Sequence, residues 1–298
     1  MSVILKTSAL SKNYGAIKAV RELDLEISNG QVYGILGPNG SGKTTTLGMI
    51  LGIINPSSGR YNWFDRVSLK NALYKIGSII ELPTFYPYLS AVQNLKIVTD
   101  IKRKGRHNIP NVLEKVGLAE RKNNSYKTYS LGMKQRLALA AALVTEPEVL
   151  VLDEPTNGMD PQGIADIRNL ILEVAGAGTT IFLASHLLDE VQKICSHVAV
   201  LEKGRKIFDG PVDKILEGDE QLEIWAEDVA LLQQCLSEFK GIEMVNKMRD
   251  KFVIKLQPGP TKKDLHKYLI EKGVYPTHFV TSTGTLESKF LELLNQKR

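Results

Sequence analysis

The stretch "GPNGSGKTT", from Gly37 to Thr45, follows the apolar run "VYGIL" and precedes the helical pattern "TLGMILGI". Its three glycines allow successive backbone N–H groups to curve around phosphate oxygens, and the N-terminus of the next helix adds its dipole. Lys43 is placed to reach the β- and γ-phosphates of a nucleotide, and Thr44 to ligate Mg²⁺. The residues expected to contact the nucleotide are Gly37, Pro38, Asn39, Gly40, Ser41, Gly42, Lys43, Thr44 and Thr45. This order of strand, loop and helix predicts an α/β fold built around a phosphate-binding loop.

A second chemical signal is the stretch "EVLVLDEP", from Glu148 to Pro155, which predicts a buried parallel strand ending in two carboxylates. Beside a phosphate-binding loop, the pair indicates a division of labour. Asp153 would hold Mg²⁺ through water, and Glu154 would orient and polarise the attacking water. The alternative is an acidic pair at a helix N-terminus, and the presence of the phosphate-binding loop makes this interpretation the weaker one.

The composition describes an ordinary globular chain of 298 residues, 43% hydrophobic and 24% charged, long enough for one large and one smaller domain. No apolar run approaches the length of about 18 residues that a membrane span needs. The start "MSVILKTSAL" lacks the pattern of a secretory signal, so we expect a cytoplasmic protein. Cys195 and Cys235 lie in separate segments without metal-ligand spacing, which predicts free thiols.

The net charge of +5 arises within residues 1–218, mostly from nine basic residues between Lys96 and Lys127. A solvated helix face is the simplest interpretation. A surface near anionic lipid headgroups or an acidic partner loop is the alternative. Nucleic acid is not expected as a partner, because few aromatic residues alternate with these charges.

The order of strand and helix patterns divides the chain in two. Residues 1–218 alternate apolar strand-like runs with helical patterns, which predicts a largely parallel sheet, and about residues 90–145 look like an inserted helical subdomain. Residues 219–298 suggest a small α+β module of order βαββαβ with one added helix. The strands expected in the first part are "LDLEI" (23–27), "QVYGILG" (31–37), "KIGSII" (75–80), "EVLVLD" (148–153), "TTIFLAS" (179–185) and "HVAVLEKGRKIFDG" (197–210).

An Ala-rich helix is predicted after "TYS", with Ser130 as its N-cap. A helix N-terminus with a free hydroxyl can also bind phosphate. The residues themselves leave open whether Ser130 is a cap alone or also a phosphate ligand.

Together these residues resemble one family, the nucleotide-binding subunits of ATP-binding cassette (ABC) transporters, over about residues 3–215. Gly37–Thr45 matches the Walker A motif, "SLGMKQ" the ABC signature, "VLVLDEP" Walker B, "NGMD" the D-loop with Asp160, and His186 in "ASHLLDEV" the switch histidine. Tyr14 stands where the family's aromatic residue stacks on adenine. The resemblance implies a P-loop NTPase cassette with a mainly parallel core sheet, an antiparallel β subdomain and the helical insert, followed by a ferredoxin-like module.

The resemblance also implies a mechanism that needs a second subunit. Ser130 and Gly132 of one subunit would close on the γ-phosphate of ATP held by Lys43 of another, in a homodimer or beside a close paralogue. His186 would contact the γ-phosphate and the attacking water. Hydrolysis of ATP would drive a separate membrane permease, which would hold the subunit at the cytoplasmic face of the membrane.

Two positions depart from the common motifs of the family. Leu131 replaces a glycine of the signature, and "YSLGMKQR" looks like ABC-2-type exporter ATPases. Glu81 occupies the place of the Q-loop glutamine, which contacts Mg²⁺ and water, as in the bacitracin and lantibiotic export branch. A solvated loop residue is the alternative for Glu81.

The expected function is therefore that of the ATPase subunit of an ABC-2-type exporter. A soluble ABC ATPase of translation or DNA repair is a second hypothesis, although the two cassettes or long insertions common in such proteins are not seen. A third is an ATPase gated by a ligand at the C-terminal module.

Overall fold

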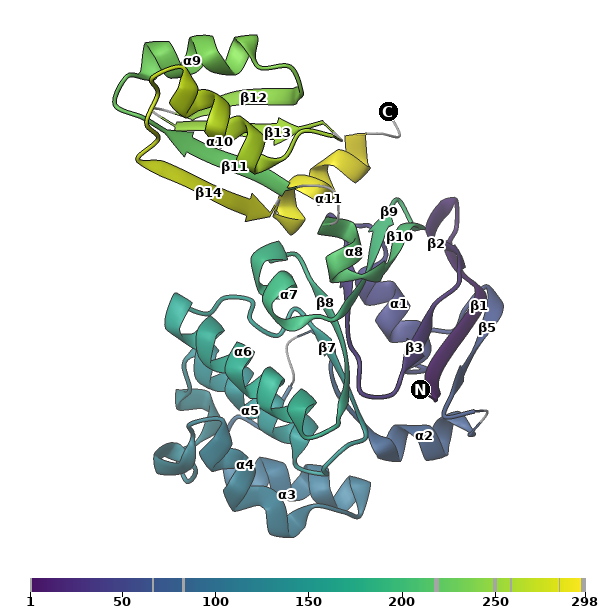
Figure 1. Cartoon of the computed structure of the whole chain (residues 1–298). Coiled ribbons are helices and arrows are strands. Elements are labelled where there is room, and N and C mark those ends of the chain that lie inside the picture. Colours follow the sequence, from purple (N-terminus) through teal and green to yellow (C-terminus); the bar gives the residue numbers. More distant parts are fainter. Residues whose placement is uncertain are drawn as a thin grey trace. The chain divides into compact units, whose positions relative to one another are not determined.

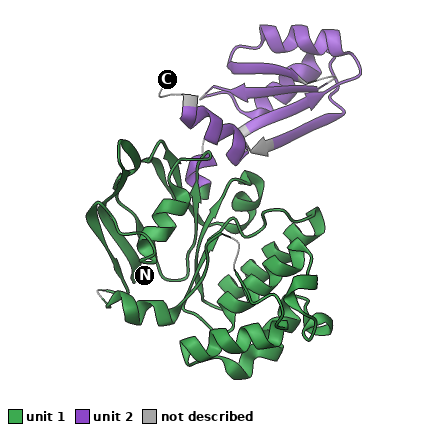
Figure 2. Ribbon diagram, turned by 180° about the vertical axis from the view of Figure 1, so that it is seen from behind, with its two compact units in different colours: residues 1–212 green, residues 213–298 purple. Residues whose placement is uncertain are grey.

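The computed structural model describes residues 2–65, 67–81, 84–216, 220–248, 251–257, 259–283 and 285–295. The chain forms two compact units, Met1–Val212 and Asp213–Arg298 (Figure 2). The boundary predicted from the sequence, between residues 218 and 219, lies outside the described residues. In the described part of the chain, no helix has both the length and the apolar character needed to cross a membrane.

The centre of the first unit is a six-stranded sheet with the order β10-β9-β4-β8-β7-β6. Figure 1 labels four of its strands, β7, β8, β9 and β10. Its strands are β4 (Val32–Leu36), β6 (Ile76–Ile79), β7 (Val149–Asp153), β8 (Thr180–Ser185), β9 (His197–Glu202) and β10 (Arg205–Pro211). All neighbours pair in parallel except β9 and β10. Every residue of β4, β7 and β8 is buried, as the continuous apolar runs predict for a sheet covered on both faces.

Parallel pairing brings the carboxyl ends of β4, β7 and β8 to the same edge of this sheet. The phosphate-binding loop follows β4, Asp153 ends β7, and His186 follows β8. Ligands of open α/β sheets bind beyond the carboxyl ends of the strands. The topology therefore collects at one edge the residues that the sequence analysis singled out.

In a second, antiparallel sheet the sequence analysis missed two strands entirely and a third except for Leu23, with which the predicted strand 23–27 begins. The members of this sheet are β1 (Val3–Tyr14), β2 (Ile17–Leu23), β3 (Glu26–Ser28) and β5 (Ser58–Trp63). In β1 the alternation of buried and exposed residues is interrupted where Ala9 takes a left-handed φ of 47° and the pairing shifts register. In β5, Trp63 is the one fully buried side chain. Neither segment has the regular period of two that identifies a strand.

The segment around residues 90–145 is mainly helical, and it contains α3 (Ala91–Lys102), α4 (Ile109–Lys115) and α5 (Leu131–Leu143). Ser90 and Gln93 form a capping box at the start of α3. Several of its basic residues are exposed and form ion pairs, as Arg106 does with Asp100. The other helices of the first unit are α1 (Lys43–Ile50), α2 (Leu69–Lys75), α6 (Pro161–Gly176) and α7 (Leu188–Ile194), and α8 (Val212–Leu216) spans the unit boundary.

The second unit has its own core. The elements are β11 (Glu220–Trp225), α9 (Val229–Glu238), β12 (Ile242–Met248), β13 (Lys251–Leu256), α10 (Lys262–Glu271), β14 (His278–Thr283) and α11 (Leu286–Asn295). The strands form an antiparallel sheet of order β12-β13-β11-β14. Alternate residues of β11 and β13, such as Ile224 and Ile254, pack with Leu232 of α9 and Leu265 of α10. This self-contained core is what an independently folding module requires.

Candidate functional site

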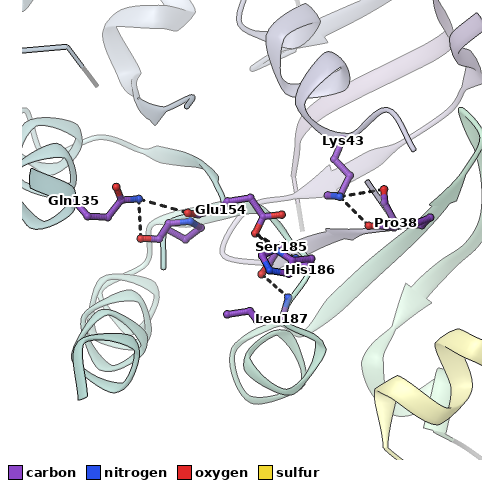
Figure 3. Close-up of polar contacts among 9 residues, drawn as sticks. Pro38, Lys43, Gln135, Glu154, Ser185, His186 and Leu187 are labelled. Atoms are coloured by element: carbon purple, nitrogen blue, oxygen red, sulfur yellow. Dashed lines mark hydrogen bonds and ion pairs between the residues drawn. The ribbon is translucent and has the colours of Figure 1, made fainter. Parts of the chain in front are cut away.

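The phosphate-binding loop runs from the end of β4 to the start of α1. The Nζ atom of the buried Lys43 donates to the carbonyl oxygens of Gly37 at 2.8 Å and Pro38 at 3.4 Å (Figure 3). Gly42 has a φ of 105°, and a Cβ there would lie 2.5 Å from the Ala19 carbonyl oxygen. A side chain at position 42 would therefore break the loop. The Oγ atom of Ser41 is buried and finds no hydrogen-bond partner among the described residues.

A cleft of about 640 Å³ opens over this loop. The loop lines it together with Ala16–Ala19, Arg21 and Lys203, and Glu154 stands at its wall. A volume of this size is typical of small-molecule sites. The cationic side chains of Lys18, Arg21 and Lys203 suit a polyphosphate, and the sequence analysis missed them because each comes from the antiparallel sheet or the β9–β10 turn.

The structure places Tyr14 at the end of β1, two residues before the cleft wall begins at Ala16. Tyr14 is 47% exposed, and the Nζ atom of Lys12 lies over its ring, 5.1 Å from the ring centre. Tyr14 is not among the described residues that line the cleft. Stacking of this ring on adenine stays a prediction.

A second cavity, of about 480 Å³, gathers the predicted metal ligands. The residues Thr44, Glu81, Asp153 and Glu154 all line it, although they come from three separate segments of the chain. Glu81 is exposed and has a left-handed φ of 57° just after β6. The structure thus brings Glu81, predicted from the Q-loop position, beside Asp153 at the end of β7 and Glu154 just after it.

Asp153 is buried at the end of β7, and its Oδ1 atom has no hydrogen-bond partner in the described part of the chain. Burial raises the pKa of this carboxyl, and a hydrogen bond with Thr44 partly opposes the shift. Glu154 and Glu81 raise the pKa further, whereas Lys43 lowers it. A buried carboxylate oxygen without a partner, beside two other carboxylates and a hydroxyl, fits a hard divalent cation such as Mg²⁺.

Glu154 and His186 form a close polar contact at the site (Figure 3). The Oε2 atom of Glu154 lies 2.7 Å from Nδ1 of His186 and accepts from the His186 backbone N–H at 3.3 Å. Glu154 has a left-handed φ of 47°, a conformation that costs an L residue about 1–2 kcal/mol. Strain of this kind is common at functional sites. The two contacts with His186 hold the Glu154 carboxylate in one position.

The remaining predicted residues lie at helix N-termini. Ser130 caps α5 and accepts from the Met133 N–H at 3.3 Å, and Asp160 caps α6 and accepts from the Gly163 N–H at 2.9 Å. Both are exposed, and neither they nor Gly132 are among the described residues that line the phosphate cleft of their own chain. The structure therefore leaves Ser130, Gly132 and Asp160 apart from Lys43.

A residue near the site to which the sequence analysis assigned no role lies at the end of the signature stretch "SLGMKQ". Gln135 of α5 is buried and donates to the backbone of Glu154 and Pro155. A single buried polar residue among the apolar positions of the Ala-rich helix was the signal that could have identified it.

Comparison with known proteins leads to the same kind of protein as this site geometry does. The sequence profile of the family described as "ABC transporter" matches residues 20–157. The chain is 37% identical over 300 residues to the bacitracin transport ATP-binding protein BcrA of Bacillus licheniformis, a match that covers 99% of this chain and 98% of that protein. The chain belongs to the ABC transporter family. As a member of this family it is an ATP-binding subunit that hydrolyses ATP.

Two further relatives support the assignment to the ABC transporter family. The lantibiotic transport ATP-binding protein SrtF of Streptococcus pyogenes is 39% identical over 220 residues, which cover 74% of this chain and 94% of that protein. Among solved structures, cbiO1 of Clostridium perfringens, part of the ABC transporter complex cbiONQ, superposes with a TM-score of 0.63 at 32% identity. That match covers 72% of this chain and 91% of the other. The expected P-loop ABC cassette fold is thereby confirmed.

Proposed function

We propose that this subunit powers an ABC-2-type exporter for peptide antibiotics or similar compounds, through a separate membrane permease that holds it at the cytoplasmic face. The observation that carries the proposal is the match to a bacitracin transport protein along 99% of the chain, which includes the second unit as well as the ATP-binding unit. The lantibiotic transport relative supports the same substrate class.

We propose that ATP and Mg²⁺ occupy the two adjoining cavities. The backbone N–H groups of the loop from Gly37 to Thr45, with Ser41 and Lys43, would hold the phosphates, and Tyr14 would stack on adenine. Thr44, Asp153 and Glu81 would hold Mg²⁺, and the unpaired Oδ1 atom of Asp153 supports this assignment. When bound, Mg²⁺ would offset the negative charge of the phosphates.

Glu154 would act on the attacking water. Glu154 lines both the phosphate cleft and the cavity of acidic residues, so its carboxylate would reach a water between them. The contact with His186 would hold the carboxylate in place and put the imidazole near the γ-phosphate. The chain's contribution is then positioning and electrostatics, as in other phosphoryl transfers.

We propose that each ATP site is completed by a second ATP-binding subunit. Ser130, Gly132 and Asp160 lie outside the phosphate cleft of their own chain, and Ser130 presents its hydroxyl at the exposed N-terminus of α5. Helix N-termini favour phosphate. In a head-to-tail dimer, these residues would close on the γ-phosphate held by the other copy.

The second unit would be a ferredoxin-like regulatory or dimer-stabilising module, with the domain boundary near residues 212–218. Its element order, sheet order and separate core support this view. A ligand-binding role that gates the ATPase is the alternative for this module.

Purification in detergent from the native host tests the proposal. We expect a polytopic membrane protein to accompany the chain in a stable complex whose ATPase activity requires Lys43. Recovery with ribosomes or nucleic acid, and without a membrane protein, would instead favour a soluble ABC ATPase of translation or DNA repair.

A further inference from the structure

Gln135 links the helix that carries Ser130 to the backbone of the water-polarising residue. The side chain is 4% exposed, and its Nε2 atom donates to the carbonyl oxygen of Pro155 at 3.0 Å and to that of Glu154 at 3.4 Å (Figure 3). These two carbonyl groups belong to the turn that follows β7. Gln135 therefore contacts the main chain at Glu154, and the carboxylate stays free for water and His186.

In both contacts the side-chain amide of Gln135 acts as a hydrogen-bond donor through its NH2 group. Its Oε1 atom is buried, and no hydrogen-bond partner for it exists among the described residues. Burying an unpaired amide oxygen is costly, and an apolar side chain of the same size would avoid the cost. The two donated hydrogen bonds are thus the feature that distinguishes glutamine from an apolar residue at this position.

The backbone that receives these bonds is strained. Glu154 has a φ of 47°, which few residues other than glycine adopt. Its N–H donates to the Ala184 carbonyl oxygen at 2.9 Å, and its own carbonyl oxygen also accepts from the Asn157 N–H at 3.1 Å. A strained backbone conformation persists where several surrounding contacts hold it in place. Gln135 adds a restraint from outside the turn.

Leu131 provides a second contact between α5 and the same turn. It lies four residues before Gln135 and so on the same face of the helix. A Cβ on Gly158 would lie 2.6 Å from the Cδ2 atom of Leu131, so the leucine side chain lies directly against this glycine. The face of α5 that begins beside Ser130 thus touches the turn near Glu154 and again at Gly158.

We infer that Gln135 is a positioning residue for ATP hydrolysis: its two hydrogen bonds hold the Glu154 backbone in the left-handed conformation and tie it to the N-terminal end of α5. The inference rests on the proposed role of Glu154. It adds that the placement of the water-polarising carboxylate depends on the helix that presents Ser130.

Two substitutions separate the hydrogen bonds from the packing. Gln135→Met keeps the length of the side chain and removes both donors. Gln135→Glu keeps the shape but places a carboxylate against two carbonyl oxygens until it is protonated and can donate one hydrogen bond. Among the described residues, the carboxylates that line the same cavity as Gln135 are Glu81, Asp153 and Glu154. Gln234, an exposed glutamine of α9 that bonds Glu238, provides matched control substitutions to Met and Glu.

The experiment measures kcat and KM for ATP with the full chain at pH 8, beside Glu154→Gln. We expect Gln135→Met to lower kcat about tenfold or more, with KM changed less than about twofold, because the phosphate-binding loop is intact. Gln135→Glu should lower kcat at pH 8 by at least about the same factor, because its carboxylate cannot donate to either carbonyl oxygen. The Gln234 variants should behave as the unsubstituted protein.

Several results would overturn the inference. One is a kcat for Gln135→Met within about twofold of the unsubstituted value. Another is a loss confined to KM, which would indicate a role in binding or folding. A kcat for Gln135→Glu within about twofold of the unsubstituted value at pH 8 would exclude the donor role. If Glu154→Gln itself retained full turnover, the proposed role of Glu154 would fail, and that result is distinct from a failure at Gln135 alone.

Discussion

The Nδ1 atom of His186 lies 2.7 Å from the Oε2 atom of Glu154, and the His186 backbone N–H donates to the same oxygen at 3.3 Å. The imidazole and the carboxylate come from the ends of neighbouring strands, β8 and β7. We therefore expect the two residues to act as one unit in ATP hydrolysis and the effects of their substitutions on kcat not to be additive.

Removal of the imidazole should slow hydrolysis more than it weakens ATP binding. We expect His186→Ala to lower kcat by about tenfold to a hundredfold. The loss is limited because the His186 backbone N–H still contacts Glu154. ATP binding should change less, because the phosphate-binding loop is untouched. The double variant with Glu154→Gln should be little slower than Glu154→Gln alone. Steady-state kinetics of the three variants measure this, and fully additive losses would show that the two residues act separately.

Asp153 should reduce the stability of the nucleotide-free protein at neutral pH. Burial raises its pKa above the ordinary value, so the folded state binds the proton more tightly and stability falls as pH rises through the raised pKa. Asp153→Asn should remove this loss, raise the Tm at pH 7 without nucleotide, and abolish the extra stabilisation by Mg²⁺ with ATP. Thermal unfolding across pH provides the measurement.

Asp166 provides a control of opposite sign. Hydrogen bonding to Arg136, at 2.7 Å, holds the pKa of this carboxyl below its ordinary value. Its contribution to stability is therefore present above the unfolded pKa and is lost as pH falls through the folded pKa. Asp166→Asn should lower the Tm at pH 7. A lower Tm for Asp153→Asn as well would contradict the account of Asp153.

Glu81 should act as an electrostatic ligand beside Asp153. Glutamine offers a neutral carbonyl oxygen of similar reach, so Glu81→Gln should keep measurable ATPase activity and change its Mg²⁺ dependence. Glu81→Ala removes the ligand and should lower activity further and uncouple it from a membrane partner. Mg²⁺ titrations with and without that partner compare the three proteins. Coincident curves would leave Glu81 as a solvated loop residue.

The second unit should be dispensable for nucleotide binding. Its core forms within the unit, so a chain ending at Gly218 should remain folded and bind ATP with an affinity within about threefold of the full chain. Sizing chromatography and nucleotide titration test this. Aggregation of the shortened chain would mean that the two units share a core.

The sequence predicted those parts of the site that are local. The phosphate-binding loop lies between a strand and a helix, and Asp153 ends an unbroken apolar run, so short patterns sufficed. By contrast, β1 and β5 were missed because a left-handed Ala9 and an exposed, polar segment erase their alternation.

Contacts that depend on the tertiary fold were out of reach of such patterns. Nothing in the local sequence places Lys203 of the β9–β10 turn beside the phosphate-binding loop, or Gln135 against the carbonyl oxygen of Pro155. Glu81 was found through a resemblance, and the neighbours that it has in the cavity follow from strand pairing between β6 and β7.

The central claim is that Glu154 polarises the attacking water at an ATP site completed by a second subunit, and Glu154→Gln tests it most directly. The variant keeps every phosphate ligand, so it should bind ATP, hydrolyse it at least about tenfold more slowly, and accumulate as an ATP-bound dimer on sizing chromatography. Near-normal turnover together with a monomer in the presence of ATP would contradict the account.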